Sequence, residues 1–299
     1  MVVVVTGASG QLGQSLQFIA PNYPQIKFHF YNSSELNITD LENCKTIFSE
    51  IKPDFCINAA AYTAVDKAES EPEKAYAINV TGAENLAKVC KENNTVLLHI
   101  STDFVFDGNA SKPYTEDDTP NPTGVYGQTK LDGEKAIQEI WEKHFIIRTS
   151  WVYSQFGNNF MKTMLRLGAE RDSLSVVNDQ IGTPTNAVDL AEVLVRIITF
   201  CHAELVLASQ SHLPFSIFHL SSKIFNFSNE GQCSWYEFAK KIFEINKIEI
   251  DLQPIPTSSY PTPAKRPSYS VLDKSKIKEV FGSEISEEIS DWEERLKEI

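Results

Sequence analysis

Tyr126 and Lys130 stand four residues apart at the start of a predicted helix. That spacing places both side chains on one helix face. A lysine ammonium close to a phenol stabilises the phenolate and lowers its pKa from about 10. The pair therefore predicts an acid-base catalyst that works near neutral pH. Tyr and Lys at this spacing more often lie on a solvated helix face, so the assignment depends on its surroundings.

Ser101 and Thr102 carry hydroxyl groups at the end of a predicted strand. They follow the apolar stretch 96–100, which predicts that this strand is buried. Open α/β sheets bind ligands at the carboxyl ends of their strands. A hydroxyl at this position can hold a carbonyl oxygen. Together with Tyr126 and Lys130 it predicts a site for carbonyl chemistry.

A glycine-rich turn, Gly7-x-x-Gly10-x-x-Gly13, lies between the opening run of four valines and a predicted helix. The first two glycines let backbone N–H groups approach a pyrophosphate, and Gly13 permits close helix packing at the positive end of the helix. The turn therefore predicts a dinucleotide site. The second strand ends at residues 31–34, which include neither an acid nor an arginine, so both NADPH and NADH remain candidate cofactors.

The elements that must position these residues alternate along the first half of the chain. Strands are predicted at 1–5, 26–31, 55–58, 96–101 and 145–149, and helices at 14–20, 41–51, 73–93 and 126–141. Such alternation predicts an α/β fold with a doubly wound parallel (Rossmann) sheet.

After residue 151 the pattern becomes less regular, with helices predicted at 159–167, 188–201, 235–245 and 274–281, and five prolines crowd residues 254–267. We expect residues 1–150 to form the dinucleotide-binding domain, joined by a later segment near 175–202. Residues 151–174 and 203–299 are expected to form mainly a smaller C-terminal substrate-binding lobe.

Composition excludes several classes of function. A formal net charge of −13 without a basic block argues against nucleic-acid binding. The opening valine run is too short for a signal peptide or a membrane span, and the five scattered cysteines suggest buried thiols in a reducing cytoplasm. The histidines show no spacing typical of metal ligands, so no metal is expected.

The chain resembles the extended short-chain dehydrogenase/reductases. It has, in this order, their glycine-rich turn, their hydroxyl at a strand end and their Tyr-x-x-x-Lys motif. Residues 58–66, 101–108, 126–134, 148–153, 157–160, 179–185, 234–239 and 260–267 extend the resemblance to the dTDP-4-dehydrorhamnose reductase family over nearly the whole chain. It implies three catalytic residues: Thr102, Tyr126 and Lys130. It implies cofactor contacts from Gly7, Ser9, Gly10, Gln11, Leu12, Gly13, Asn37, Ile38, Ala59, Ala60, Ala61, Tyr126 and Lys130, and substrate contacts from Thr63, Val65, Phe104, Trp151 and Arg266.

Two positions depart from the family pattern. Phe104 replaces a tyrosine that lies close to the sugar, and Asn37 replaces an aspartate that reaches the adenine. Residues 203–222 look like an insertion and are expected to be a surface elaboration without a catalytic role. The resemblance also allows a homodimer.

The activity that the resemblance implies is transfer of hydride from NADPH or NADH to the 4-keto group of a nucleotide sugar, dTDP-6-deoxy-L-lyxo-4-hexulose. A nucleotide-sugar 4,6-dehydratase or 4-epimerase shares the tyrosine and lysine, but a dehydratase typically has a glutamate where this chain has Phe104. A reductase-like regulatory subunit is the third alternative. The base of the nucleotide and the product stereochemistry stay open.

Overall fold

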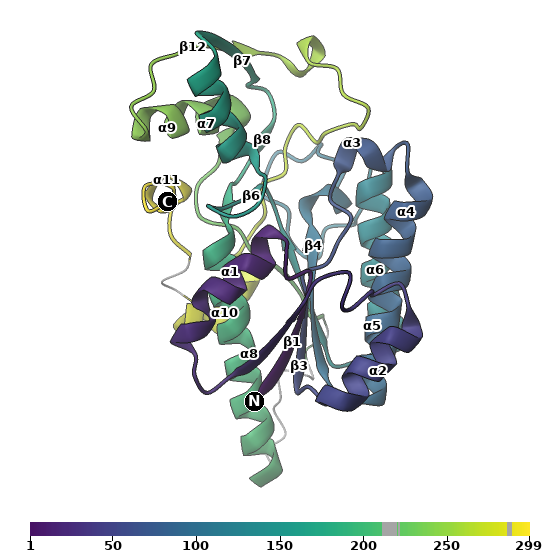
Figure 1. The fold of residues 1–299 in the computed structure, drawn as a ribbon. Coiled ribbons are helices and arrows are strands. Elements are labelled where there is room, and N and C mark those ends of the chain that lie inside the picture. The colour runs from purple at the N-terminus through teal and green to yellow at the C-terminus, as the bar shows by residue number, and fades with distance from the viewer. Residues whose placement is uncertain (211–219, 221, 286–288) are drawn as a thin grey trace.

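Six parallel strands form the central sheet of the computed structural model, which describes residues 1–210, 220, 222–285 and 289–299 (Figure 1). The strands are β1 Val2–Thr6, β2 Lys27–Tyr31, β3 Phe55–Asn58, β4 Val96–Thr102, β5 His144–Thr149 and β10 Ile224–Asn226. Their order is β10-β5-β4-β3-β1-β2. Because the chain moves outward from β1 in both directions, the switch point lies between β1 and β3. The predicted doubly wound sheet is confirmed.

Both faces of the sheet are covered, which explains why β1 is a run of valines. Val3 and Val5 pack in one core with helices α1 Gln11–Ile19, α8 Ala187–Gln210 and α10 Ser275–Ile285. Val4 points to the opposite core, against α2 Leu41–Ile51, α5 Gly82–Glu92 and α6 Val125–Ile140. Figure 1 shows these two helix layers on either side of the sheet. A strand buried on both faces cannot alternate apolar and polar residues.

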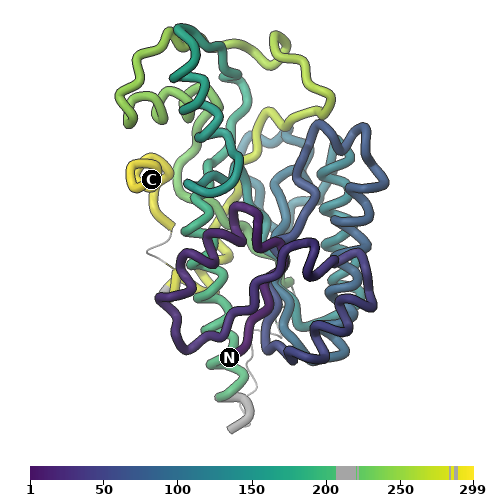
Figure 2. The backbone as a smooth tube through the Cα atoms, in the orientation of Figure 1, coloured from purple at the N-terminus to yellow at the C-terminus, as the bar shows by residue number. Residues whose placement is uncertain are grey.

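A smaller group of elements lies beyond the carboxyl edge of the sheet, where the tube in Figure 2 changes from teal to green. Its core joins α7 Phe160–Glu170 and α9 Trp235–Ile245 to the parallel pair β7 Ser173–Val177 and β12 Asp251–Ile255. Short pairs complete it: β6 Val152–Tyr153 with β9 Thr185–Asn186, and β8 Ile181–Gly182 with β11 Cys233–Ser234; α11 Trp292–Leu296 packs beside them.

Part of the region that we expected in the smaller lobe belongs to the large sheet. Strand β10 is only three residues long and pairs with β5, and α10 packs in the same core as α8. The prediction for 203–299 was therefore too broad, because a three-residue strand gives no periodic signal. Helix α8 was expected to end at residue 201 but continues to Gln210. The rest of the proposed insertion, 211–219 and 221, lies outside the described residues.

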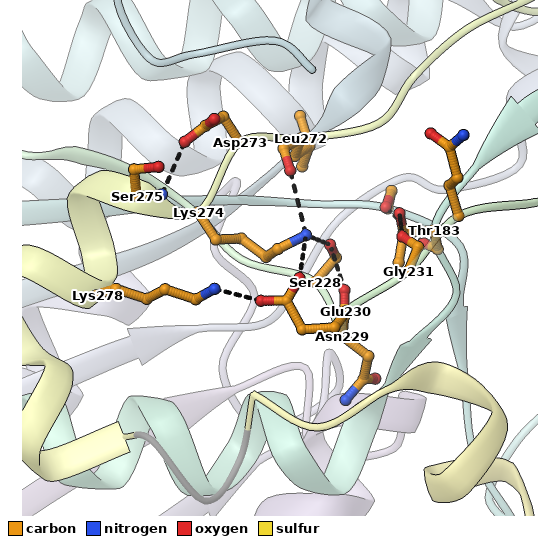
Figure 3. A network of polar contacts seen from close by, with 12 residues as sticks. Thr183, Ser228, Asn229, Glu230, Gly231, Leu272, Asp273, Lys274, Ser275 and Lys278 are labelled. Carbon is orange, nitrogen blue, oxygen red and sulfur yellow. Dashed lines mark hydrogen bonds and ion pairs between the residues drawn. The ribbon is translucent and has the colours of Figure 1, made fainter. Parts of the chain in front are cut away.

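A buried lysine just before α10 contacts the segment that follows β10 (Figure 3). Lys274 Nζ donates to Ser228 Oγ at 3.4 Å and to the Leu272 carbonyl at 3.3 Å, and lies 3.6 Å from a carboxylate oxygen of Glu230. Lys278 also pairs with Glu230. Burial lowers the pKa of Lys274 below its usual value. This cluster anchors the C-terminal segment against the sheet.

The long helix predicted at 73–93 is interrupted. It consists of α4 Pro72–Tyr76, a π-helical turn at Ala77–Thr81 and α5. Within the turn, the buried Asn79 side chain accepts from the Tyr62 N–H and donates to Thr129 Oγ1. A π turn widens the helix, and here it directs Asn79 toward α6.

Helix α6 is held to the sheet by a buried ion pair. Arg148 donates to Glu134 through Nε at 3.0 Å and Nη2 at 2.7 Å, and Ser101 donates to the same carboxylate. The Arg148 guanidinium also lies over the Phe106 ring. Glu134 accepts three hydrogen bonds, two of them from the Arg148 cation, which offsets the cost of burying its charge.

None of the helices in the described ranges combines the length and apolar character that crossing a bilayer requires.

We predict that Arg148→Met lowers the free energy of unfolding by about 3–5 kcal/mol, because it leaves the Glu134 carboxylate buried without its cation. The double variant Arg148→Met with Glu134→Leu should lose less free energy of unfolding than the sum of the losses in the two single variants. Arg166→Met, which breaks an exposed pair with Glu170, is the control and should cost below about 1 kcal/mol. Urea unfolding measures all four; equal losses for Arg148→Met and Arg166→Met would contradict the assignment.

Candidate active site

The predicted residues gather at the carboxyl edge of the sheet, at its switch point. Gly7 follows β1, Ala59 follows β3 and Thr102 ends β4. Because these strands are parallel neighbours, their last residues lie side by side. This edge faces the smaller lobe (Figure 1).

The glycine turn has the geometry that its sequence predicts. Gly7 has φ of +69°, and a Cβ there would lie 2.6 Å from the Ala59 and Ala60 backbone. A Cβ on Gly13 would lie 2.3 Å from the Gly7 carbonyl oxygen. Gly10 is exposed and stands directly before α1 as its N-cap residue, and no side chain among the described residues caps that helix. The turn thus leaves backbone N–H groups at a positive helix end, which fits a pyrophosphate.

Ser9 lies exposed in the turn, whereas Leu12 is buried beneath it. The Gln11 side chain makes hydrogen bonds to the smaller lobe, and its predicted contact with the cofactor stays a prediction. Its Oε1 accepts from Ser154 Oγ and Asn159 Nδ2, and its Nε2 lies 3.4 Å from the Val152 carbonyl. The side chain therefore links the turn to the smaller lobe.

The end of β2 has a carboxylate that the sequence reading overlooked. Glu35 folds back so that Oε2 accepts from the Asn32 N–H at 3.0 Å. Asn32 Oδ1 in turn accepts from the Ser34 N–H and hydroxyl. The available signal was a glutamate four residues past the end of β2. Dinucleotide folds use an acid in this region to bind the adenosine ribose.

Asn37 and Ile38 lie in the following loop. Asn37 Oδ1 accepts from the Thr39 N–H and hydroxyl, so the side chain is partly engaged in a local turn. The Ile38 side chain is buried against Gly82, where a Cβ would approach Ile38 Cδ1 to 2.6 Å. Ile38 can therefore offer a ligand little beyond its backbone.

The loop after β3 contains Ala59, Ala60 and Ala61, all half-buried. The Ala60 N–H points inward, 3.2 Å from Asn58 Oδ1. Their small side chains allow the loop to pass against the Gly7 turn.

Helix α6 begins at Val125, and its entrance is capped from another segment. Gly124 has no side chain to cap the helix, and the Glu69 carboxylate accepts from the Val125 N–H at 2.8 Å. A Cβ on Gly127 would lie 2.1 Å from the Phe104 carbonyl oxygen, so this glycine lets α6 approach the end of β4. Tyr126 is thereby brought to Thr102.

Thr102, Tyr126 and Phe104 form one cluster. Thr102 Oγ1 accepts from the Phe104 N–H at 3.2 Å and donates to Asp103 Oδ1 at 3.0 Å, and it lies close enough to the Tyr126 phenol to act on the pKa of that group. The Phe104 ring packs edge-on against Tyr126 with centroids 5.5 Å apart. This arrangement agrees with the prediction that the Thr102 hydroxyl and the Tyr126 phenol lie near each other at the end of β4.

The predicted effect of Lys130 on Tyr126 is wrong in this geometry. Burial raises the pKa of Tyr126 to about 12, against the opposing hydrogen bond from Thr102. Lys130 Nζ donates instead to the Ile100 carbonyl at 2.6 Å and lies 3.1 Å from His99 Nε2. Burial lowers the pKa of Lys130 to about 8. The phenol therefore stays protonated at neutral pH, as a proton donor requires.

Asp103 is a buried carboxylic acid near the Tyr126 phenol. Its Oδ2 has no hydrogen-bond partner in the described part of the chain. Burial raises its pKa to about 6, against hydrogen bonds from Ser270 and Thr102. Ionising Asp103 is therefore less favourable in the folded protein than in water, although the group still ionises above about pH 6.

The loops on the substrate side hold Thr63, which is exposed, and Val65, which begins α3 Val65–Ala68. Arg266, for which a substrate contact is predicted, is paired within the protein. It donates to both carboxylate oxygens of Asp66, at 3.1 and 2.7 Å, and lowers the pKa of that acid. The pair joins the proline-rich loop to α3 at the rim of the site.

Trp151 packs within the smaller lobe. Its ring stacks on Trp235 with centroids 3.5 Å apart, and a Cβ on Gly182 would lie 2.5 Å from it. One ring face is thus occupied by protein. The structure thus shows Trp151 packed against the protein, and its predicted contact with a sugar remains a proposal.

The described residues contain no group of three or more His, Cys, Asp or Glu side chains able to hold a metal ion.

A doubly wound sheet, a glycine turn at its switch point and a Thr–Tyr–Lys set at the adjoining strand end define an extended short-chain dehydrogenase/reductase. The family model described as RmlD substrate binding domain matches residues 1–299. The chain is 41% identical to the dTDP-4-dehydrorhamnose reductase of Aggregatibacter actinomycetemcomitans, over 99% of this chain and 97% of that protein. The chain belongs to the RmlD substrate-binding domain family.

Solved structures agree. A dTDP-4-dehydrorhamnose reductase from Clostridium acetobutylicum matches with a TM-score of 0.86 and 39% identity, covering 100% of this chain and 98% of that one. The Bacillus anthracis dTDP-4-dehydrorhamnose reductase in complex with NADP matches with a TM-score of 0.85 and 36% identity, covering 99% and 97%.

We predict that Asp103→Asn stabilises the protein at pH 8. Because the folded-state pKa of Asp103 is raised, the native state binds the extra proton, and stability falls as pH rises from about 4 to 6. The amide removes this loss, so the gain should be about 1–3 kcal/mol at pH 8 and vanish near pH 4. Thermal melts across pH measure it.

The control is Asp107→Asn. Hydrogen bonds, led by that from the Asn109 N–H, lower the pKa of Asp107, so removing this carboxylate should cost stability at pH 8. The same sign for both variants would contradict the assignment for Asp103.

Proposed function

We propose that this chain reduces the 4-keto group of dTDP-6-deoxy-L-lyxo-4-hexulose (dTDP-4-dehydrorhamnose) to give dTDP-L-rhamnose, with NADPH or NADH as reductant. The observation that carries the proposal is the meeting of Thr102 and Tyr126 at the strand end next to the glycine turn, in a chain related over its whole length to such reductases. The bound cofactor supplies the hydride.

The residues of the chain have separate roles in this proposal. Tyr126 donates the proton to the keto oxygen, because burial keeps its phenol protonated. Thr102 holds that oxygen, and Lys130 binds the nicotinamide ribose. The backbone of residues 7–13 binds the pyrophosphate at the start of α1, and the loops at 37–38 and 59–61 line the adenine and ribose.

Arg266 is proposed to bind the substrate diphosphate, in exchange for Asp66. A guanidinium that already makes a bidentate contact with a carboxylate presents the geometry that a phosphate needs. Thr63, Val65, Phe104 and Trp151 are proposed to line the sugar side.

We also propose that residues 1–150, with the segment near 175–202, act as the dinucleotide-binding domain, and 151–174 with much of 203–299 as the substrate lobe. The enzyme is proposed to be a homodimer in the cytoplasm; its five buried free cysteines suit a reducing compartment. Analytical ultracentrifugation measures the assembly, and a single monomeric species would exclude the dimer.

The activity is tested by adding dTDP-4-dehydrorhamnose to purified protein with NADPH or NADH and following cofactor absorbance, with the product identified by NMR. Cofactor oxidation with formation of dTDP-L-rhamnose is expected. Absence of turnover with both cofactors would favour the regulatory-subunit alternative, and a cofactor that stays bound through a cycle would favour an epimerase.

We predict that Tyr126→Phe keeps cofactor affinity but lowers kcat by roughly 10²- to 10⁴-fold, because only the proton donor is lost. Lys130→Ala should weaken cofactor Kd as well as kcat. Steady-state kinetics and fluorescence titration separate the two. Near-normal turnover of Tyr126→Phe would place the proton donor elsewhere.

We predict that kcat/KM with NADPH and with NADH differ by less than about a thousandfold, roughly 4 kcal/mol, since residues 31–34 include neither an acid nor an arginine and the Glu35 carboxylate beyond them already accepts from the Asn32 N–H. Glu35→Gln should move the ratio toward NADPH, because it removes a carboxylate that repels a 2′-phosphate. Glu92→Gln, at the exposed end of α5, is the control. An unchanged ratio in Glu35→Gln would exclude Glu35 from the ribose site.

A further inference from the structure

A buried line of polar groups runs beneath the site, from the loop after β3 to the lysine of α6. The Ala60 N–H donates to Asn58 Oδ1 at 3.2 Å, Asn58 Nδ2 lies 2.9 Å from His99 Nδ1, and His99 Nε2 lies 3.1 Å from Lys130 Nζ. The three side chains are each at most 2% exposed. Water therefore does not compensate a mismatched contact, and each group must find its partner in the line.

The backbone fixes the direction of this line. The N–H of Ala60 lies 3.2 Å from Asn58 Oδ1 and 3.4 Å from Thr6 Oγ1, and Thr6 Oγ1 donates to the same Asn58 oxygen at 2.7 Å. Because the Ala60 N–H can only donate, an NH₂ group in place of that oxygen would face another donor, so the Asn58 oxygen faces Ala60. The Asn58 amide therefore presents its NH₂ group to His99. An NH₂ group can only donate, so His99 Nδ1 must be the unprotonated ring nitrogen.

The proton of the neutral imidazole then lies on Nε2 and points at Lys130 Nζ. An ammonium group has no lone pair to accept it, whereas a neutral amine has one and still donates an N–H to the Ile100 carbonyl. The contact therefore favours the uncharged amine of Lys130.

The electrostatic surroundings agree with this assignment. Burial holds the pKa of His99 well below its usual value, so the ring stays neutral. Burial also lowers the pKa of Lys130, while the Glu134 carboxylate opposes that change.

We propose that His99 is a positioning residue for Lys130: Asn58 fixes it as the Nε2–H tautomer, and its N–H sets how readily Lys130 binds a proton and hence the pH range of turnover. The role in turnover rests on the proposed function; the tautomer does not. No covalent step is involved, since His99 acts only through its hydrogen bond.

The first test needs no activity. Long-range ¹H–¹⁵N NMR of the complete protein distinguishes the two imidazole tautomers, and the His99 signals are assigned by their loss in His99→Gln. An Nε2–H tautomer between pH 6 and 8 is expected. An Nδ1–H tautomer or an imidazolium would overturn the proposal.

The second test reverses the direction of the hydrogen bonds along this line of polar groups. Asn58→Asp keeps an oxygen for the Ala60 N–H but presents another oxygen to His99, so Nδ1 should take the proton and Nε2 should accept from a Lys130 ammonium. The alkaline limb of the kcat/KM profile should move up by about one pH unit, a tenfold gain in proton affinity. His99→Leu, which removes the donor, should move it in the same direction.

The control is His144→Gln, another buried strand histidine, which contacts the Trp141 carbonyl. It should leave the alkaline limb in place. A limb that is unmoved, or moved to lower pH, in both Asn58→Asp and His99→Leu would overturn the role of His99. If the NMR shows the Nε2–H tautomer but the protein reduces no keto sugar nucleotide, the proposed function fails and the tautomer assignment stands.

Discussion

The geometry of the site depends on one buried carboxylate. Glu134 lies on α6, and it accepts from Arg148 on β5 and from Ser101 on β4, so three elements meet at one ion. Because Tyr126 and Lys130 lie on the same helix, this contact sets how far they reach over the strand ends. A charge buried with its partners costs desolvation, yet removing a single partner costs more. Such a pair therefore specifies one position of the helix.

Strand β4 serves the site from both of its faces. Ser101 reaches Glu134 on α6, while Thr102 ends the strand beside Tyr126 and Asp103. His99 lies two residues before Ser101 and meets Lys130. Short polar side chains can lie in an otherwise apolar strand because each finds a fixed partner on a neighbouring element.

The sequence was sufficient wherever a local pattern sets the geometry. Gly7 and Gly13 occupy positions where a side chain would collide with backbone, and Thr102 is recognisable because it ends a buried strand. The contacts that the sequence could not predict join segments that lie far apart in the chain. Arg266 meets Asp66 200 residues away, and nothing local to either residue indicates the pair.

Other features were hidden because their signal resembles ordinary structure. His99 reads as a core residue of an apolar strand, and the three residues of β10 are too few for a period. Asn79 falls within a long helical pattern, and only the π turn shows that its side chain faces α6.

Two contacts across the site, one made by Gln11 and the other by Arg266 with Asp66, differ in their chemistry. Gln11 joins the turn before α1 to the smaller lobe through neutral hydrogen bonds, whereas Arg266 and Asp66 join α3 to the proline-rich loop through opposite charges that are partly exposed. Dissolved salt screens the second contact but hardly affects the first. Ionic strength therefore acts unequally on the two sides of the site: at high salt the rim at Arg266 loosens while the phosphate turn stays joined to the lobe.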